Sequence, residues 1–138
     1  MLKRYLSRSG DLGKLVLRLT LGAILLFHGI NKLQHGVAWI KPRLAEIGLP
    51  GFLAYGTYVA EVLAPILLIV GYRVRLAALT IAFEMVMAIV LVLRHQVFSL
   101  SKAPGGAWAI ELQALILLTA AALALLGGGA YSLSRADG

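Results

Sequence analysis

The hydrophobic residues of this chain gather in four long stretches, and polar residues are concentrated between them. Each stretch holds roughly 19–21 residues, and a helix of that length crosses a hydrocarbon layer of about 30 Å. The pattern predicts four transmembrane helices, at about residues 12–32, 52–70, 74–93 and 108–126. We therefore expect an all-α fold, an integral membrane four-helix up-down bundle, in a single membrane domain covering residues 1–138.

The connections between these stretches carry residues that end helices. Proline and glycine interrupt the chain at residues 49–51 and 103–106, and a glycine turn at residues 71–73 makes the second and third spans antiparallel neighbours. Three consecutive glycines at residues 127–129 end the fourth helix. The longest connection, residues 34–50, mixes aromatic, apolar and basic residues, which indicates a segment lying on the membrane surface.

The composition supports a lipid environment. Hydrophobic residues make up 60% of the 138 positions and charged residues 14%, whereas soluble domains are about 25% charged. The chain has no cysteine, which excludes disulfides, thiolate metal sites and thiol redox relays. The net charge of +7 does not indicate nucleic acid as a partner, because the basic residues stand mainly at the ends of apolar stretches, where they meet lipid headgroups.

The basic residues also predict an orientation. One side of the bundle would carry seven of them: Lys3, Arg4, Arg8, Lys14, Arg73, Arg75 and Arg135. The other side would carry five: Lys32, Lys41, Arg43, Arg94 and Lys102. Because the more basic side faces the cytoplasm, we expect a multi-pass protein of the inner (plasma) membrane with both termini in the cytoplasm.

Several ionisable residues lie within or at the ends of the predicted spans: Arg18, His28, Lys32, Glu61, Glu84 and Glu111. A charge at the bilayer centre costs about 2.5–3.5 kcal/mol on insertion scales, so such residues usually face the interior and pair with one another. From the helix rise, Glu61 and Glu84 both lie about 13 Å from the outer surface, and His28 and Glu111 about 5 Å from it. His95 follows directly after the third span.

Three further positions, two glycines and a proline, affect how the helices pack around this interior. Gly22 and Gly29 share the face of the first span that carries Arg18, which lets a neighbouring helix approach closely. Pro65 follows Glu61 by four residues and has no N–H, so the Glu61 carbonyl loses its helical partner.

Each charged residue also has a structural interpretation. Lys32 and Arg18 would reach the headgroups with their long side chains. Glu61 and Glu84 would share a proton, or either would pair with Arg18 as a structural lock. Glu111 would complement the dipole at the start of its helix.

The same residues limit the kinds of cofactor that the chain is expected to bind. His28 and His95 stand at the outer ends of separate spans, so a haem bound by two histidines is one alternative. The chain shows no nucleophile motif, phosphate loop or two-histidine zinc spacing, and we predict no metal site.

Motifs along nearly the whole chain resemble those of a known family. They are residues 18–22 (RLTLG), 28–33 (HGINKL), Glu61, 71–78 (GYRVRLAA), His95, Glu111 and 127–133 (GGGAYSL). Together they are similar to the DoxX-like family of small four-helix membrane proteins. The closing motif departs from the family pattern at Ser134, where an acid is usual, and Glu84 has no counterpart in that pattern.

The family takes its name from a subunit of an archaeal terminal quinol oxidase, so the resemblance implies a redox-associated protein. The first hypothesis is binding of a quinone or similar lipophilic molecule in the outer half of the bundle. His28 and Lys32 would donate hydrogen bonds, Glu111 or Glu61 would relay protons, His95 would lie near the ligand, and Arg18 and Glu84 would be structural or relay residues.

Two further hypotheses come from other classes. The chain would be a non-catalytic accessory subunit of a larger respiratory or oxidoreductase complex, or a transporter of protons or small molecules. A transporter this short would have to form a homo-oligomer to build a pathway. The lipid bilayer is the partner that all three hypotheses share.

Overall fold

The computed structural model describes residues 1–134, and every element of secondary structure in that part of the chain is helical apart from one isolated β-bridge, Leu100 to Trp108. The elements are α1 (Leu2–His35), η1 (Ala38–Ile40), α2 (Lys41–Glu46), η2 (Gly51–Tyr55), α3 (Gly56–Tyr58), η3 (Val59–Leu63), α4 (Ala64–Val70), α5 (Val74–Ala88), η4 (Ile89–Leu93), η5 (Arg94–Gln96) and α6 (Glu111–Leu126). The all-α prediction is confirmed for these residues. Arg135, which entered the charge count, lies outside them.

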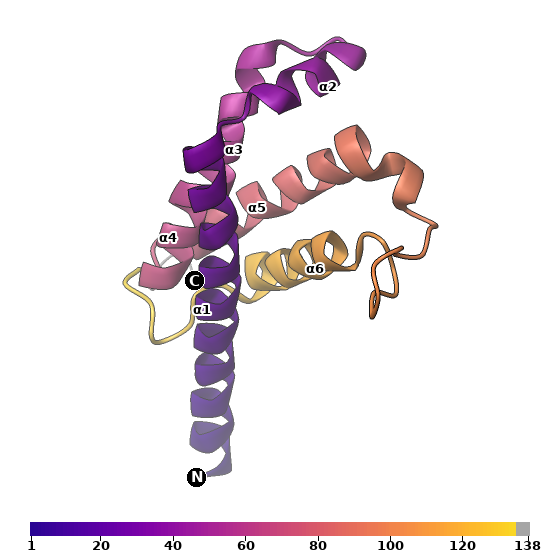
Figure 1. The fold of residues 1–138 in the computed structure, drawn as a ribbon. Helices are drawn as coiled ribbons and strands as arrows, with labels where there is room; N and C mark the ends of the chain where they lie inside the picture. The colour runs from indigo at the N-terminus through magenta and orange to yellow at the C-terminus, as the bar shows by residue number, and fades with distance from the viewer. Residues whose placement is uncertain (135–138) are drawn as a thin grey trace.

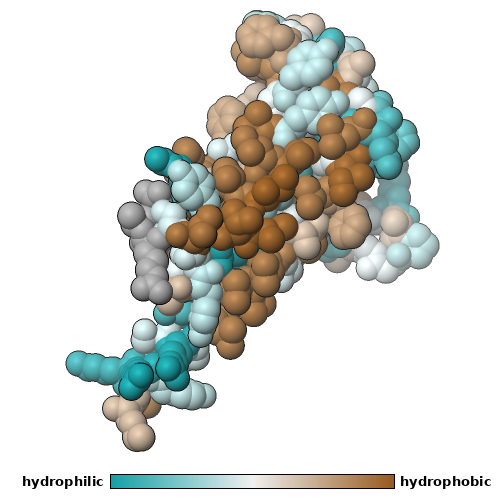
Figure 2. All heavy atoms as spheres, turned by 90° about the vertical axis from the view of Figure 1, so that its left-hand side faces the viewer, coloured by the Kyte–Doolittle hydropathy of each residue, from teal (hydrophilic) through white to brown (hydrophobic). Residues whose placement is uncertain are grey.

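Within residues 1–134, three continuous helical segments are long and apolar enough to cross a membrane: Leu2–His35, Gly51–Val70 and Val74–Gln96. The fourth apolar helix, Glu111–Leu126, is shorter. Large apolar side chains on these helices face outward, among them Phe27, Phe83 and Leu118, each at least two-thirds exposed. Figure 2 shows the resulting broad apolar band across the middle of the molecule, with polar side chains gathered where α1 begins. Such a surface is stable in lipid and unfavourable in water, so the chain is a membrane protein.

The helix α1 runs along the whole molecule, and its first turns extend beyond the other helices (Figure 1). It packs against η3 and α4, and two of its glycines lie at the contact. A Cβ atom on Gly29 would collide with the carbonyl oxygen of Glu61, and one on Gly22 would come 2.7 Å from Ile69. The prediction that glycines allow close approach is therefore confirmed, and it brings the backbone of α1 next to Glu61.

The helices α5 and α6 lie side by side and close the core together with α1 and α4 (Figure 1). Buried apolar side chains from all four elements form this core, among them Leu21, Leu25, Leu68, Ile81, Ile116 and Leu123. A second, smaller cluster of Val37, Ile40, Leu44 and Ala54 holds the segments η1, α2 and η2 together as a cap over one end of the helices. This cap corresponds to the connection that we expected on the membrane surface.

The second membrane segment changes its helical pitch at Glu61. Residues Val59–Leu63 form a π-helical turn, in which the N–H of Ala64 donates to the carbonyl of Val59. Pro65 cannot donate to Glu61, so the ordinary α-helical bond at this point is lost, as the sequence predicted. A turn of this kind widens the helix locally and often marks a functional site.

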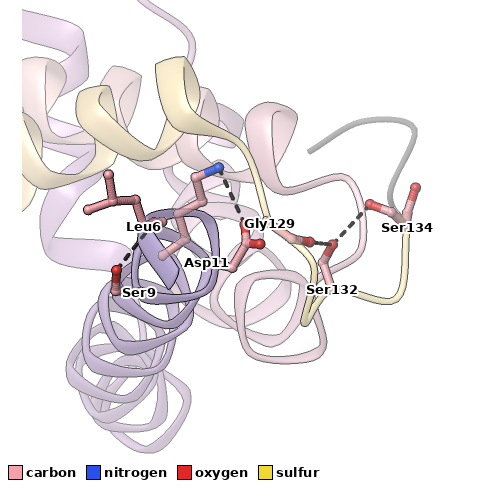
Figure 3. Close-up of polar contacts among 7 residues, drawn as sticks. Leu6, Ser9, Asp11, Gly129, Ser132 and Ser134 are labelled. Atoms are coloured by element: carbon pink, nitrogen blue, oxygen red, sulfur yellow. Dashed lines mark hydrogen bonds and ion pairs between the residues drawn. The ribbon is translucent and has the colours of Figure 1, made fainter. Parts of the chain in front are cut away.

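The C-terminal loop returns to α1 and to the turn between α4 and α5. The N–H of Ser134 donates to the carbonyl of Gly71 at 3.1 Å. Figure 3 shows this loop beside α1, with Gly129 next to Asp11. A Cβ atom on Gly129 would lie 3.1 Å from the Asp11 carboxylate and 3.0 Å from Lys14. The C-terminal loop is thus held against α1 at Asp11 and Lys14, beyond the projecting first turns of this helix.

Candidate functional site

A cluster of three ionisable side chains lies where α1, η3 and α5 meet. The ammonium group of Lys32 donates a 2.6 Å hydrogen bond to Oε1 of Glu61 and lies 4.0 Å from Oε1 of Glu84. All three side chains are largely buried, with exposed fractions of 19% for Lys32, 5% for Glu61 and 15% for Glu84. We call these residues the Lys32 cluster.

Local structure positions each member of the cluster. The absence of a side chain at Gly29, one turn before Lys32, lets α1 approach the π-helical turn that carries Glu61. The backbone carbonyl of Lys32 also accepts a hydrogen bond from the Tyr58 hydroxyl at 3.2 Å, which ties α1 to the second segment. Glu84 projects from α5 toward the same point.

The Lys32 cluster is only partly satisfied by its own contacts. The Oε2 atoms of Glu61 and Glu84 are buried and have no hydrogen-bond partner within residues 1–134. An ammonium group can donate three hydrogen bonds, and Lys32 makes one at its side chain among these residues. Lys32 therefore has donors left for a polar group that enters the cluster.

A cavity of about 190 Å³ opens beside the Lys32 cluster, between α1, the end of α5 and α6. Its polar lining comes from His28, Lys32, Glu61 and Gln113, and Trp39 of the cap closes one side. The rest of the lining is apolar and includes Leu25 and Met85. We call this space the histidine-side cavity. It offers neutral and charged hydrogen-bonding groups at the edge of an apolar chamber.

The other residues predicted for the site lie at varying distances from it. His28 lines the same cavity as Lys32 and Glu61. Glu111 is exposed at the start of α6, two residues before the cavity-lining Gln113. His95 accepts from Arg94 at 3.2 Å, if that nitrogen is unprotonated, and lines a different, polar cavity with Ser99 and Lys102.

Arg18 stands apart from the cluster on α1. It is fully buried and donates to the carbonyls of Leu68 at 3.2 Å and Tyr131 at 2.9 Å. The pairing of Glu61 or Glu84 with Arg18, which the sequence left open, does not occur, because both carboxylates meet Lys32 instead.

Trp39 and Gln113 are part of the cavity wall, although neither was among the residues predicted for the site. No local pattern in the sequence reveals that the cap folds Trp39 back toward Lys32.

The positions of the histidines and carboxylates show which kinds of cofactor the described residues are arranged to hold. Within residues 1–134 no three side chains of the types His, Cys, Asp and Glu are grouped to hold a metal ion. His28 and His95 line separate cavities, so the structure does not bring them to a common haem-binding space. The chemistry available at the Lys32 cluster is instead hydrogen bonding, charge stabilisation and proton exchange in an apolar setting.

Comparison with known proteins identifies one family and one relative that are similar to this chain. The sequence model of the DoxX family matches residues 13–94, a range that contains Arg18, Lys32, Glu61 and Glu84. The chain is 32% identical over 122 residues to a Bacillus subtilis (strain 168) protein named "Putative oxidoreductase CatD", and this match covers 88% of the chain and 84% of that protein. No solved structure is significantly similar to the chain.

Proposed function

This chain belongs to the DoxX family, and we propose that it is a redox-associated membrane protein that binds a quinone or a similar lipophilic carbonyl compound at the Lys32 cluster. The name of its Bacillus relative supports a redox association. A quinone combines an apolar ring with two carbonyl oxygens, so its site needs an apolar chamber with hydrogen-bond donors at one or both oxygens.

One observation carries the proposal: a buried ammonium group with unused donors lies beside a cavity in the membrane-spanning part of the protein. Buried charges in membrane helices are costly and usually mark functional sites. Lys32 would donate to one ligand oxygen. His28 and Gln113 add further hydrogen-bonding groups to the same cavity.

The proposed arrangement in the membrane is a four-helix up-down bundle in the inner membrane with both termini in the cytoplasm. The contact between the C-terminal loop and the start of the bundle at Lys14 supports an even number of crossings. The helix Glu111–Leu126 would be the fourth span. At about 1.5 Å per residue its 16 residues cover roughly 24 Å, which calls for local thinning of the bilayer or help from the preceding residues.

The experiment that tests this function is mass spectrometry of an organic extract from protein purified in mild detergent. The test variant is Lys32→Met with Glu61→Gln, which removes one charge of each sign while keeping side-chain size. The matched control is Arg43→Met with Glu46→Gln, since these residues form an exposed ion pair at 3.4 Å on the cap. Both variants change the charge in the same way, so they differ only in where the pair lies.

We expect a quinone in near-equal amount to the native protein, retained in the control and lost in the Lys32 variant. Retention of the quinone in the Lys32 variant would contradict the site, and an extract holding only bulk phospholipid would contradict the function. In the second case a co-purifying oxidoreductase subunit would identify the chain as an accessory subunit, whose charged cluster is structural.

A further inference from the structure

A second and larger cavity lies on the opposite side of the Lys32 cluster. This apolar groove has a volume of about 560 Å³ and runs between the second membrane segment and α5. The cap covers one end of it with Ile40 and Leu44. Its lining is aliphatic and aromatic apart from Thr57, Thr80 and Glu84.

A small cavity of about 80 Å³ lies beside both the groove and the cluster. It shares Thr57, Glu84 and Met87 with the groove, and Lys32 and Trp39 with the histidine-side cavity. Glu84 therefore stands at the inner end of the apolar groove, with Lys32 4.0 Å behind it.

The two cavities differ in size and therefore fit different parts of a ligand. Ligand pockets in proteins usually measure about 300–1,000 Å³. The groove falls within that range, whereas the histidine-side cavity, at about 190 Å³, is too small for a ring together with an alkyl chain. The polar lining of the smaller cavity suits water or the head of a ligand.

The rim of the groove faces the lipid. Leu53, Val59 and Phe83 line the groove and are also 42%, 48% and 67% exposed on the apolar surface. A molecule dissolved in the bilayer could enter between these side chains without crossing a polar layer. A water-soluble ligand would have to cross the hydrocarbon region to reach the same opening.

We propose that the apolar groove binds the alkyl or isoprenoid tail of the ligand, and that its polar head lies at the Glu84 end, within reach of Lys32. This assignment rests on the proposed function and makes the ligand a tailed, membrane-resident molecule. Glu84, which lines the groove, is the group that meets the head from the groove side. A ligand hydroxyl would donate to it, and a ligand carbonyl would accept from Lys32.

Gly56 offers a way to fill the groove without disturbing the fold. It lines the groove, has a helical φ of −59°, and a Cβ atom added to it would meet nothing within 4 Å. Gly56→Leu therefore adds a branched side chain at the wall of the groove. Thr80→Leu fills the same space from α5 and provides a second variant. Gly13→Leu is the matched control, because Gly13 also has open space and lies outside the groove.

The test compares two benzoquinone probes, one with a ten-carbon alkyl tail and one without a tail. Binding is measured in detergent by quenching of Trp39 fluorescence, in a Trp108→Phe background so that Trp39 is the only tryptophan. Comparing variants in the same detergent cancels the partitioning of each probe into micelles. We expect Gly56→Leu and Thr80→Leu to weaken the tailed probe about tenfold, the loss expected when about two buried methylene groups lose their contacts. The tailless probe and the Gly13→Leu control should change less than about threefold, which is within the range of surface substitutions.

A further variant separates the two cavities. Leu112 lines the histidine-side cavity and does not line the groove. If Leu112→Phe abolishes binding of the tailed probe while both groove variants bind it normally, the tail lies in the other cavity and this inference is wrong, although the proposed function stands. If neither probe binds the native protein, the proposed function itself fails.

Discussion

Two buried cations lie on the same helix and have different surroundings. Arg18 and Lys32 are separated by 14 positions, or about 21 Å along α1. Arg18 is fully buried, its side-chain hydrogen bonds go to backbone carbonyls, and it lines none of the cavities described above. Lys32 is bonded to a carboxylate, faces two cavities and keeps part of its surface open.

The difference shows that a buried charge is not sufficient to define a site. Arg18 supplies donors where the last turn of α4 has carbonyls without helical partners, at the negative end of that helix. It also holds the C-terminal loop through Tyr131, and it packs so tightly that a Cβ atom on Gly71 would collide with it. Arg18 also keeps one buried donor, its Nε, without a partner within residues 1–134, but of the two cations Lys32 is the one with adjacent space. We interpret Arg18 as a structural residue that holds the end of α4 and the C-terminal loop together, and Lys32 as the centre of the functional site.

The largest effect that tests this comparison is expected at Arg18. Arg18→Ala leaves two carbonyls without their hydrogen-bond donor and also opens a large cavity. We therefore expect the free energy of unfolding in detergent to fall by about 3–5 kcal/mol. Thermal unfolding, monitored by circular dichroism, measures this loss of stability. Arg4→Ala, on the exposed part of the same helix, should change stability by less than about 0.5 kcal/mol. If Arg18→Ala were as stable as the native protein and yet lost the quinone, the roles of the two cations would be reversed.

A smaller effect is expected where α1 touches Glu61. Gly29→Ala puts a methyl group against the Glu61 carbonyl oxygen and should destabilise the protein by about 1–3 kcal/mol. Because Glu61 lies in the displaced turn, the variant should also bind the tailed quinone probe more weakly. Gly13→Ala meets open space on the same helix and should be neutral or stabilising by up to about 1 kcal/mol. Unchanged probe binding in Gly29→Ala would mean that the position of Glu61 does not matter to the site.

Much of this architecture could be predicted from local sequence. The apolar stretches predicted the helical segments, since about 20 residues are needed to cross the hydrocarbon layer. Gly22 and Gly29 predicted the close contact of α1 with the second segment, and Pro65 predicted the lost helical bond at Glu61. The equal depth of Glu61 and Glu84 followed from the helix rise, and both carboxylates do reach the same ammonium group.

The remaining features depend on distances that periodicity does not fix. Helical rotation allowed the carboxylates to face either Arg18 or Lys32, and the choice depends on how η3 and α5 pack against α1. The partner carbonyl of Arg18 at Tyr131 is 113 positions away, so no local pattern indicates it. The return of Trp39 to the cavity depends on the fold of the cap, which is held by its own small apolar cluster.

The smallest effect concerns the two carboxylates of the Lys32 cluster. Double-mutant cycles that combine Lys32→Met with Glu61→Gln, and separately with Glu84→Gln, measure how strongly each carboxylate is coupled to the ammonium group. We expect about 1–3 kcal/mol for Glu61, which is hydrogen-bonded at 2.6 Å, and less than about 1 kcal/mol for Glu84 at 4.0 Å. Among residues 1–134 Arg18 has no such carboxylate partner, so the cycle tests the feature that distinguishes the two regions. Equal coupling would mean that Glu84 is held as firmly as Glu61 and is not free to meet a ligand. A weak coupling leaves Glu84 available to the groove, because a carboxylate that loses little by leaving Lys32 can bind a ligand head without destabilising the cluster.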